Sequence, residues 1–298
     1  MLVTGNIEDK NLRNVECYLR YLKRCGYERH NTVVSSAQNG CDVINKMLDT
    51  FNDRHKKQTL IIEMKKQPDL QLLPLSEFSW LKENERVCNL VWVTIRDTHS
   101  SIKDWVAPGF DYRSLELQFN PKSTIERFNE IIKFFDRGCR EGDPVAWGRN
   151  VMMCLLRKCR GILNESKKPF SWLKRKNEVQ ISWAHNYFYK EKDVSFKSNN
   201  RPKRVFQSPI SIDEKYLGLY AAFDSWEIQV DSKTLFLHNF NIAWHQKKHR
   251  DIREGKKVCN VILDEDVKNK LDSLAKMKGL KLNETIAFLI EQEYQKCL

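Results

Sequence analysis

The sequence predicts a mainly α fold, with a duplicated helical N-terminal region and a C-terminal segment ordered strand, helix, helix. Three observations support this prediction. Apolar residues recur at helical spacing along most of the chain, a five-residue motif occurs twice, and a β-branched run precedes the last two helical patterns. The chain has 298 residues, 41% of them hydrophobic, which is enough for two or three domains with a sizeable core.

Two amphipathic helices are predicted near the N-terminus. In residues 1–35 an apolar stripe ends at Cys25 and Gly26, and a second helix runs from about Gly40 to Asp53. The run 59–64 fits either a strand or the start of a helix, because six residues do not decide between them. The stripe of the first helix consists of Leu12, Val15, Leu19 and Leu22.

An internal repeat organises the next part of the chain. The motif FSWLK at residues 78–82 recurs at 170–174, and each copy lies between similar helical patterns. We therefore predict two divergent copies of one helical unit, about 36–100 and 115–195, within a helical region 1–195. The Phe and Trp of each motif are expected in the core and the Lys outside. The alternative is an aromatic and basic surface on which nucleotides stack.

A basic linker and connector is predicted at 196–232, followed by a third region at 233–298. Arg201, Lys203 and Arg204 of the linker form a candidate phosphate clamp. A long helix is predicted from Lys233 to Arg250, apolar at first and basic at its C-terminal end.

The charge of the chain favours a polyanionic partner. The net charge is +12 and the pI is about 9.2. Residues 167–204 hold eleven Lys or Arg against three Asp or Glu, a net of +8, and residues 244–257 hold six against two, a net of +4. The net charges of these two stretches add up to the net charge of the whole chain. A basic run is often only a solvated surface, but two of them near a predicted DNA-reading segment indicate phosphate contact.

Several other classes of protein are disfavoured by the sequence. No apolar run reaches the length of a membrane span, and the N-terminus lacks a signal-peptide pattern. Nine cysteines are scattered without a CxxC pair, which predicts reduced thiols and a cytoplasmic protein. GxxxxGK[ST], GxGxxG and HExxH are all missing, and the pair His245 and His249 lacks a third metal ligand. We therefore expect no enzyme activity and no cofactor.

The C-terminal segment carries the clearest pattern. Val258 to Leu263 is apolar and mostly β-branched or small, which favours a strand. Two helical patterns follow, separated by Gly279 at a left-handed C-cap position, and the second begins near Asn283. A single strand needs a pairing partner, so we predict a homodimer whose strands form a two-stranded ribbon. Such a ribbon fits the major groove of double-stranded DNA.

These residues resemble a known family of DNA-binding domains. The segment 240–298 is similar to the ribbon-helix-helix superfamily, and within it to the Ter-macrodomain organising family, MatP. The resemblance rests on Val261, Leu263, Val267, Leu271, Leu274, Ala275, Gly279, the run 282–286 and the run 289–291. It implies that Val258, Asn260 and Ile262 face the DNA bases, with Cys259, Val261 and Leu263 in the core. Lys281 departs from the family, which often has a hydroxyl residue there.

The sequence thus predicts a homodimeric, sequence-specific double-stranded DNA-binding protein that is associated with the nucleoid. By resemblance, it organises a chromosome or replicon region; a transcriptional repressor is in the same class. The alternative is an adaptor whose helical region binds a protein partner and whose C-terminal domain only dimerises. The predicted phosphate contacts are Lys247, Lys248, Arg250, Lys256, Lys257 and Asn283, together with Arg201, Lys203 and Arg204 of the linker.

Overall fold

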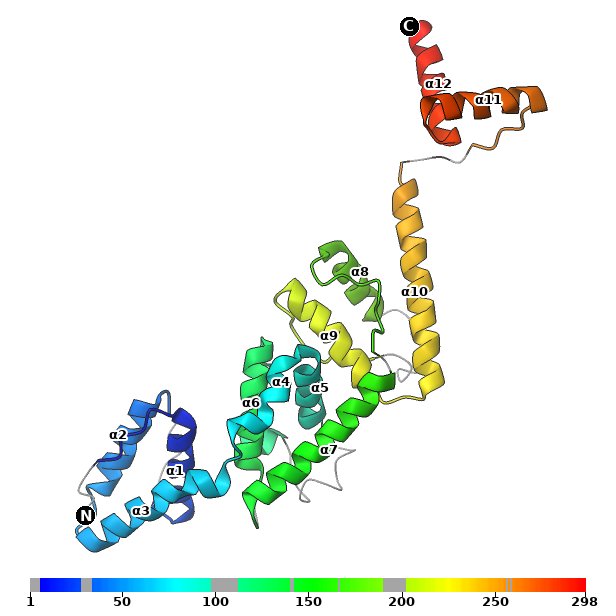
Figure 1. The fold of residues 1–298 in the computed structure, drawn as a ribbon. Coiled ribbons are helices and arrows are strands. Elements are labelled where there is room, and N and C mark those ends of the chain that lie inside the picture. Colours follow the sequence, from blue (N-terminus) through cyan, green and yellow to red (C-terminus); the bar gives the residue numbers. More distant parts are fainter. Residues whose placement is uncertain are drawn as a thin grey trace. The chain divides into compact units, whose positions relative to one another are not determined.

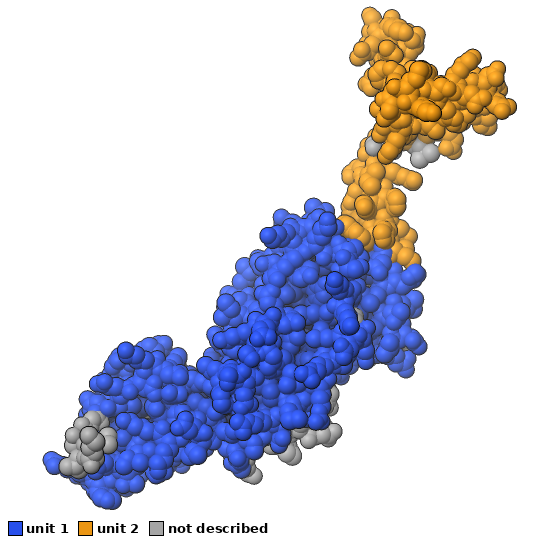
Figure 2. Space-filling model, in the orientation of Figure 1, with its two compact units in different colours: residues 1–241 blue, residues 242–298 orange. Residues whose placement is uncertain are grey.

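The computed structural model of the chain describes residues 6–27, 34–97, 112–139, 142–165, 167–189, 202–255, 257 and 259–298. The chain divides into an N-terminal unit, residues 1–241, and a C-terminal unit, residues 242–298 (Figure 2). The fold is mainly α-helical, and within the described ranges no residue lies in a β-strand (Figure 1). The predicted β-α-α arrangement of the C-terminal segment is therefore wrong.

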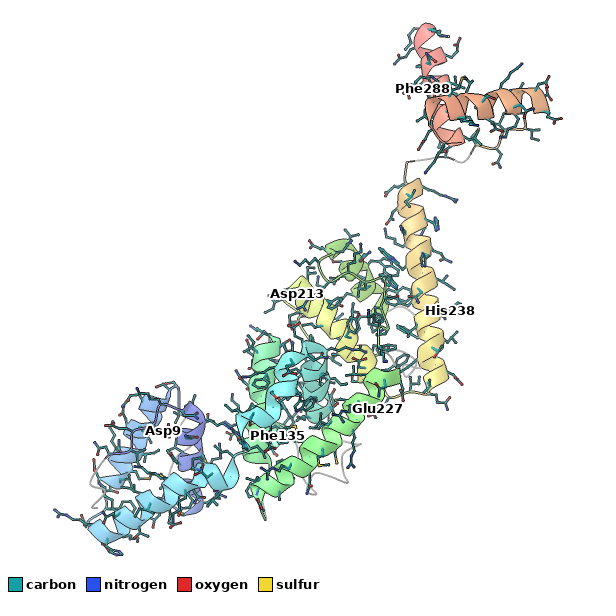
Figure 3. All side chains as sticks on the ribbon, viewed as in Figure 1. Asp9, Phe135, Asp213, Glu227, His238 and Phe288 are labelled. Atoms are coloured by element: carbon teal, nitrogen blue, oxygen red, sulfur yellow. The ribbon has the colours of Figure 1, made fainter. Side chains whose placement is uncertain are left out.

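The first three helices of the N-terminal unit enclose a small core of their own. They are α1 (Leu12–Arg24), α2 (Ala37–Leu48) and α3 (Arg54–Gln71), which includes the run 59–64. Each begins where the sequence offers a side-chain cap, from Asn11, Ser36 and Asp53 respectively. Asp9 braces this group by accepting hydrogen bonds from Asn14 and Tyr18 (Figure 3). The core contains Ile7, Val15, Leu22, Ile44 and Met64.

The larger core of this unit is organised around α5 (Glu85–Arg96), in which every residue from Val87 to Arg96 is buried. A helix with no exposed side after its first turn must be covered on all faces. Contacts come from α6 (Thr124–Gly138), α7 (Pro144–Glu165) and α9 (Ile212–Asp224). The remaining elements are the short helices η1 (Leu75–Phe78), α4 (Ser79–Glu83) and η2 (Tyr112–Leu115), with α8 (Glu178–Phe188) packed on α9.

Buried ion pairs tie these helices together. Arg127 of α6 binds Glu214 of α9, and its Nη1 also lies 3.1 Å from Oδ1 of Asn89 on α5. Arg86 of α5 makes two hydrogen bonds of 2.7 Å to the carboxylate of Asp224 at the end of α9. Burial raises the pKa of Asp224, and the adjacent Arg86 guanidinium opposes that rise. Each pair satisfies groups that would otherwise be costly to bury.

The two FSWLK motifs show the same pattern of burial. Phe78 and Phe170 are 0% and 1% exposed, and the Leu of each motif is also buried. The two Trp residues are half-buried, and the Ser and Lys residues are exposed. The core position of the Phe is therefore confirmed, whereas the Trp is only partly inward. Two helices precede each motif and one follows it, α2, α3 and α5 around the first and α6, α7 and α8 around the second. The duplication itself stays a prediction.

A long helix, α10 (Val230–Arg253), begins in the N-terminal unit and ends in the C-terminal unit. Its first turns hold Phe236 and Phe240, which lie against an aromatic cluster containing Phe188 and Trp183. The ring centroids of Phe240 and Trp183 are 5.6 Å apart and the rings are stacked. None of the described helices combines the length and apolar composition that a membrane-spanning helix needs.

The C-terminal unit continues with α11 (Glu265–Lys278) and α12 (Leu282–Lys296), which pack on each other. Gly279 ends α11 with φ +63°, so the predicted left-handed C-cap is confirmed. Residues 259–264 before α11 lie in neither a helix nor a strand. A β-branched composition does not make a strand by itself, because a strand also requires backbone hydrogen bonds to a neighbour, and the described residues supply none here.

Candidate nucleic-acid interface

The last turns of α10 form an exposed basic segment. Phe236, Phe240 and Trp244 follow each other at four-residue intervals on the buried side of the helix. The next position of that stripe is Lys248, which is exposed. From residue 245 to 253 only Lys247 is half-buried and the others are exposed. We call residues 245–253 the basic end of α10. The earlier part of α10 is anchored by aromatic packing. The basic end continues the same helix, but it has no apolar stripe of its own.

Three cations of the basic end carry no carboxylate partner among the described residues. Lys247 pairs with Asp251 one turn later. By contrast, Lys248, Arg250 and Arg253 are exposed and make no ion pair with any described residue. Arg250 and Arg253 are three residues apart and therefore lie on neighbouring positions of the helix surface. The sequence prediction included Lys248 and Arg250 but omitted Arg253, because it ended the helix three residues too early.

The other predicted DNA contacts divide into three groups. Lys257 is exposed, as a phosphate contact requires. Arg201, Lys256 and Val258 lie outside the described residues. Asn260 and Ile262 lie in the irregular segment before α11, and Ile262 is fully exposed. Their predicted role in reading bases, like that of Val258, depended on a two-stranded ribbon, which the described residues do not form.

The start of α12 is less suited to a phosphate than the sequence suggested. The helix begins at Leu282, and Asn283 is its exposed second residue. The backbone N–H of Lys281 donates a 3.0 Å hydrogen bond to the carboxylate of Glu284. A negative side chain thus already occupies the positive end of the helix dipole. We therefore leave Asn283 out of the proposed phosphate contacts.

The helices α11 and α12 expose most of their apolar side chains. Within the C-terminal unit only Trp244, Leu271, Ala275 and Thr285 are buried among the described residues. On α12 an apolar stripe runs at four-residue intervals and is largely open, with Ile290 65% exposed. Two helices of this length are too few to bury a core. The stripe consists of Leu282, Ile286, Ile290 and Tyr294.

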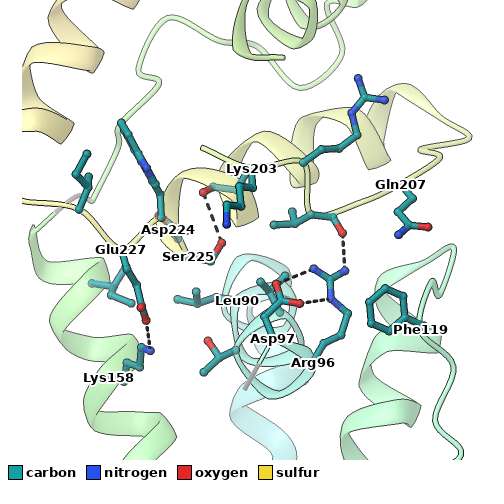
Figure 4. Close-up of a pocket in the computed structure, with 18 residues that line it drawn as sticks. Leu90, Arg96, Asp97, Phe119, Lys158, Lys203, Gln207, Asp224, Ser225 and Glu227 are labelled. Atoms are coloured by element: carbon teal, nitrogen blue, oxygen red, sulfur yellow. Dashed lines mark hydrogen bonds and ion pairs between the residues drawn. The ribbon is translucent and has the colours of Figure 1, made fainter. Parts of the chain in front are cut away.

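The part of the predicted phosphate clamp that lies within the described residues is in the N-terminal unit, at a pocket of about 790 Å³ (Figure 4). Lys203 and Arg204 both line it, together with residues of α5, α7 and α9. The Lys203 side chain points toward Ser225, and the ion pairs Arg96–Asp97 and Lys158–Glu227 also line the pocket. Lys203 and Arg204 thus lie beside a cavity and not on α10, and the guanidinium of Arg204 lies over the ring of Tyr189, which does not line the cavity.

No group of three or more His, Cys, Asp or Glu side chains among the described residues is arranged to hold a metal ion. Cys88 is fully buried, and burial raises its pKa to about 12, which disfavours the reactive thiolate. His245 and His249 are exposed on the basic end of α10.

Comparisons with models of known protein families, with curated proteins and with solved structures find no match for this chain. The resemblance to ribbon-helix-helix proteins and to the MatP family is therefore not upheld. Its signature residues in α11 and α12 describe two amphipathic helices joined by a glycine turn. That pattern is common to many helical proteins, and the strand that would distinguish the family is not found in the described residues.

Proposed function

We propose that the chain is a homodimeric, non-enzymatic protein that binds double-stranded DNA through the basic end of α10. The observation that carries this proposal is the exposure of Lys248, Arg250 and Arg253 on a helix end where no carboxylate of the described residues neutralises them. Unpaired cations on a regular helix suit the evenly spaced phosphates of a nucleic-acid backbone. Lys257, exposed just after the helix, adds to the same segment.

Backbone contact accounts for affinity, whereas sequence preference requires other groups. Besides the cations themselves, which can also bond guanine, the exposed side chains of the basic end that can bond base edges are Gln246, His245 and His249. A helix of this width enters the major groove of B-form DNA. We therefore place both the phosphate contacts and any base contacts on α10, in place of the ribbon that the sequence suggested.

The proposed dimer forms through α11 and α12. The stripe that contains Leu282 and Ile290 is apolar and exposed, and the unit has too few residues to bury it internally. A second copy of the same two helices offers the same stripe, which is the self-complementarity that a two-fold interface needs. Two copies of the basic end on one DNA duplex would also bind with higher avidity than one.

The biological role within this class is a nucleoid-associated organiser of a chromosome or replicon, or a transcriptional repressor. A genome-wide binding profile separates the two roles. Dispersed sites indicate an organiser, and a few promoter-proximal sites indicate a repressor.

The direct test is duplex binding by the full chain, measured by fluorescence anisotropy at physiological salt. The triple variant Lys248→Gln, Arg250→Gln, Arg253→Gln should bind every duplex more weakly, and by a similar factor whatever its sequence. The matched control is Lys10→Gln, Lys65→Gln, Lys122→Gln, which removes three exposed lysines of the N-terminal unit. Equal affinities of the two triple variants for DNA would contradict the proposal.

A second function, that of an adaptor, is favoured by the same exposed apolar stripe on α12. In that case the stripe dimerises the chain and the helical N-terminal unit binds a protein partner. The adaptor requires no DNA contact, so full-length protein that dimerises but binds no duplex would decide for it.

A further inference from the structure

A stripe of α10 combines isoleucine and histidine side chains. It consists of Ile242, His245, His249 and Ile252, which all belong to the C-terminal unit, and we call it the histidine stripe. All four side chains are exposed, Ile242 by 41% and Ile252 by 56%. The steps along the stripe are three, four and three residues, a spacing that keeps side chains on one face of a helix. The histidine stripe is therefore a continuous exposed face about 15 Å long.

The two histidines of this stripe are placed to share a metal ion. They are four residues apart, about one helical turn, so both imidazoles project from the same side of α10. Two histidines at this spacing on a helix are the pair that binds zinc in the HExxH motif. Neither ring makes a hydrogen bond, ion pair or ring contact with any described residue, so the ring nitrogens are open to a ligand.

One chain supplies only half of a zinc site, and a second copy can supply the rest. Zinc takes four ligands, whereas no third His, Cys, Asp or Glu joins the pair within the described residues. The histidine stripe reads the same in both directions, as Ile, His, His, Ile with steps of three, four and three. In an antiparallel two-fold pairing each histidine therefore faces a histidine, and each isoleucine faces an isoleucine. Four imidazoles then surround one point.

The cations of the basic end leave this face clear. At 3.6 residues per turn, Lys248, Arg250 and Arg253 lie about 60–120° from the centre of the histidine stripe. Lys247 lies on the opposite side of the helix and pairs with Asp251. Pairing through the histidine stripe thus places no cation between the two helices, and it leaves the proposed phosphate contacts at the sides.

We propose that His245 and His249 of two copies, paired antiparallel along the histidine stripe, bind one zinc ion in a tetrahedral site. Four imidazoles match the ligand number of zinc, and imidazole is a ligand that zinc favours. Ile242 and Ile252 pack at the two ends of the site and shield it from water. The inference rests on the proposed function in one respect, the pairing of two copies, and it uses neither the stripe of α12 nor the phosphate contacts. Imidazoles on zinc cannot bond base edges, so this state leaves base contact to Gln246 and the cations.

The test is calorimetric titration of the metal-free full chain with zinc sulfate. We expect a binding step that saturates at one ion for every two chains, and the double variant His245→Gln, His249→Gln should lose this step. The matched control is His55→Gln, His238→Gln, which changes two exposed histidines that have no histidine one turn away. It should keep the step. A step that persists in the double variant would overturn the proposal, because the zinc would then lie elsewhere, such as on exposed thiols.

Saturation at one ion for each chain, or no binding step, would also overturn it. Sedimentation analysis with zinc and with a chelator separates this site from the proposed dimer of α12. A chain that is monomeric with the chelator and dimeric with zinc would contradict the α12 dimer and support the zinc site. A chain that is dimeric under both conditions but shows no zinc step would support the α12 dimer and overturn the zinc site. Duplex binding measured with the chelator present tests the DNA contact independently of zinc.

Discussion

At the scale of single residues, Arg127 is the side chain on which the core of the N-terminal unit most depends. It is 1% exposed and binds Glu214 through both terminal nitrogens, while Nη2 also donates to the carbonyl of Pro121 at 3.0 Å. Arg127→Met removes the charge but keeps much of the volume. It leaves Glu214 buried without a partner, which should lower the free energy of unfolding by about 3–5 kcal/mol. Denaturant titration of the N-terminal unit's transition measures this loss.

The control for that prediction is Arg175→Met. Arg175 also binds two carboxylates, those of Glu85 and Asp213, but its side chain is 41% exposed. Solvent screens such pairs, so Arg175→Met should lower the free energy of unfolding by only about 0–1 kcal/mol. Similar losses for the two variants would show that burial of the Arg127 pair has no special importance.

His185 should make the stability of the N-terminal unit depend on pH. Burial lowers its pKa to about 4, and the positive charges of Arg204 and Lys215 add to the effect. Between pH 6.5 and about 4 the unfolded chain therefore binds a proton that the folded chain does not. The free energy of unfolding should fall as the pH decreases through this window.

The measurement is the denaturation midpoint between pH 7 and 4, and the variant is His185→Gln. In His185→Gln the midpoint should fall less between pH 7 and 4 than in the unchanged chain. In His238→Gln, which changes an exposed histidine of α10, it should fall as far as in the unchanged chain (Figure 3). An unchanged pH profile in His185→Gln would contradict the assignment.

At the scale of elements, two glycines of α7 provide a test of helix packing. A Cβ on Gly161 would meet no atom within 4 Å, whereas one on Gly148 would lie 2.8 Å from Cδ1 of Leu73. Gly161→Ala should raise the free energy of unfolding by about 0.5–1 kcal/mol through helix propensity alone. Gly148→Ala gains the same propensity but must displace a buried leucine, so it should be clearly less stable than Gly161→Ala. Equal thermal midpoints would refute this view of the contact between α7 and Leu73, which lies just after α3.

Helices were predicted where local signals are strong. Ser123 shows this at a helix start, because its hydroxyl caps α6 by accepting a 3.2 Å hydrogen bond from the backbone N–H of Glu126. The carboxylate of Glu126 accepts a hydrogen bond from the backbone N–H of Lys122 and not from that of Ser123, so the capping box is incomplete. Gly279 is an example at a helix end, because its left-handed conformation ends α11 as predicted. Residues 259–264 show the limit, because a strand is defined by a distant partner and not by its own composition.

The two candidate sites also differ in how far the sequence predicts them. The exposure of Lys248 and Arg250 could be predicted from sequence, because the apolar stripe of α10 visibly ends at Trp244. The pocket at Lys203 could not, because its walls come from α5, α7 and α9, which are far apart in the chain. Only the folded structure brings Asp97, Lys158 and Glu227 to the same place.

At the scale of the whole molecule, the proposed dimer predicts the effect of a charge in the apolar stripe of α12. Ile290→Glu places a carboxylate on a side chain that is 65% exposed in the single chain. The unfolding of one chain should change little, whereas the dimer should dissociate, because the charge would be buried without a partner. Sedimentation analysis should show a dimer for the unchanged chain and a monomer for Ile290→Glu. Gln292→Glu, which adds the same charge at an exposed polar position of α12, should remain a dimer.

The most direct test of the central claim is the salt dependence of DNA binding by the full chain. Each phosphate contact contributes about 0.9 to the slope of log affinity against log salt concentration. The triple change of Lys248, Arg250 and Arg253 to Gln should therefore reduce the slope by about 2.7 for each bound chain. The triple change of Lys10, Lys65 and Lys122 to Gln should leave the slope as it is. A slope that is the same in all three proteins would contradict the claim that the basic end of α10 binds the DNA backbone.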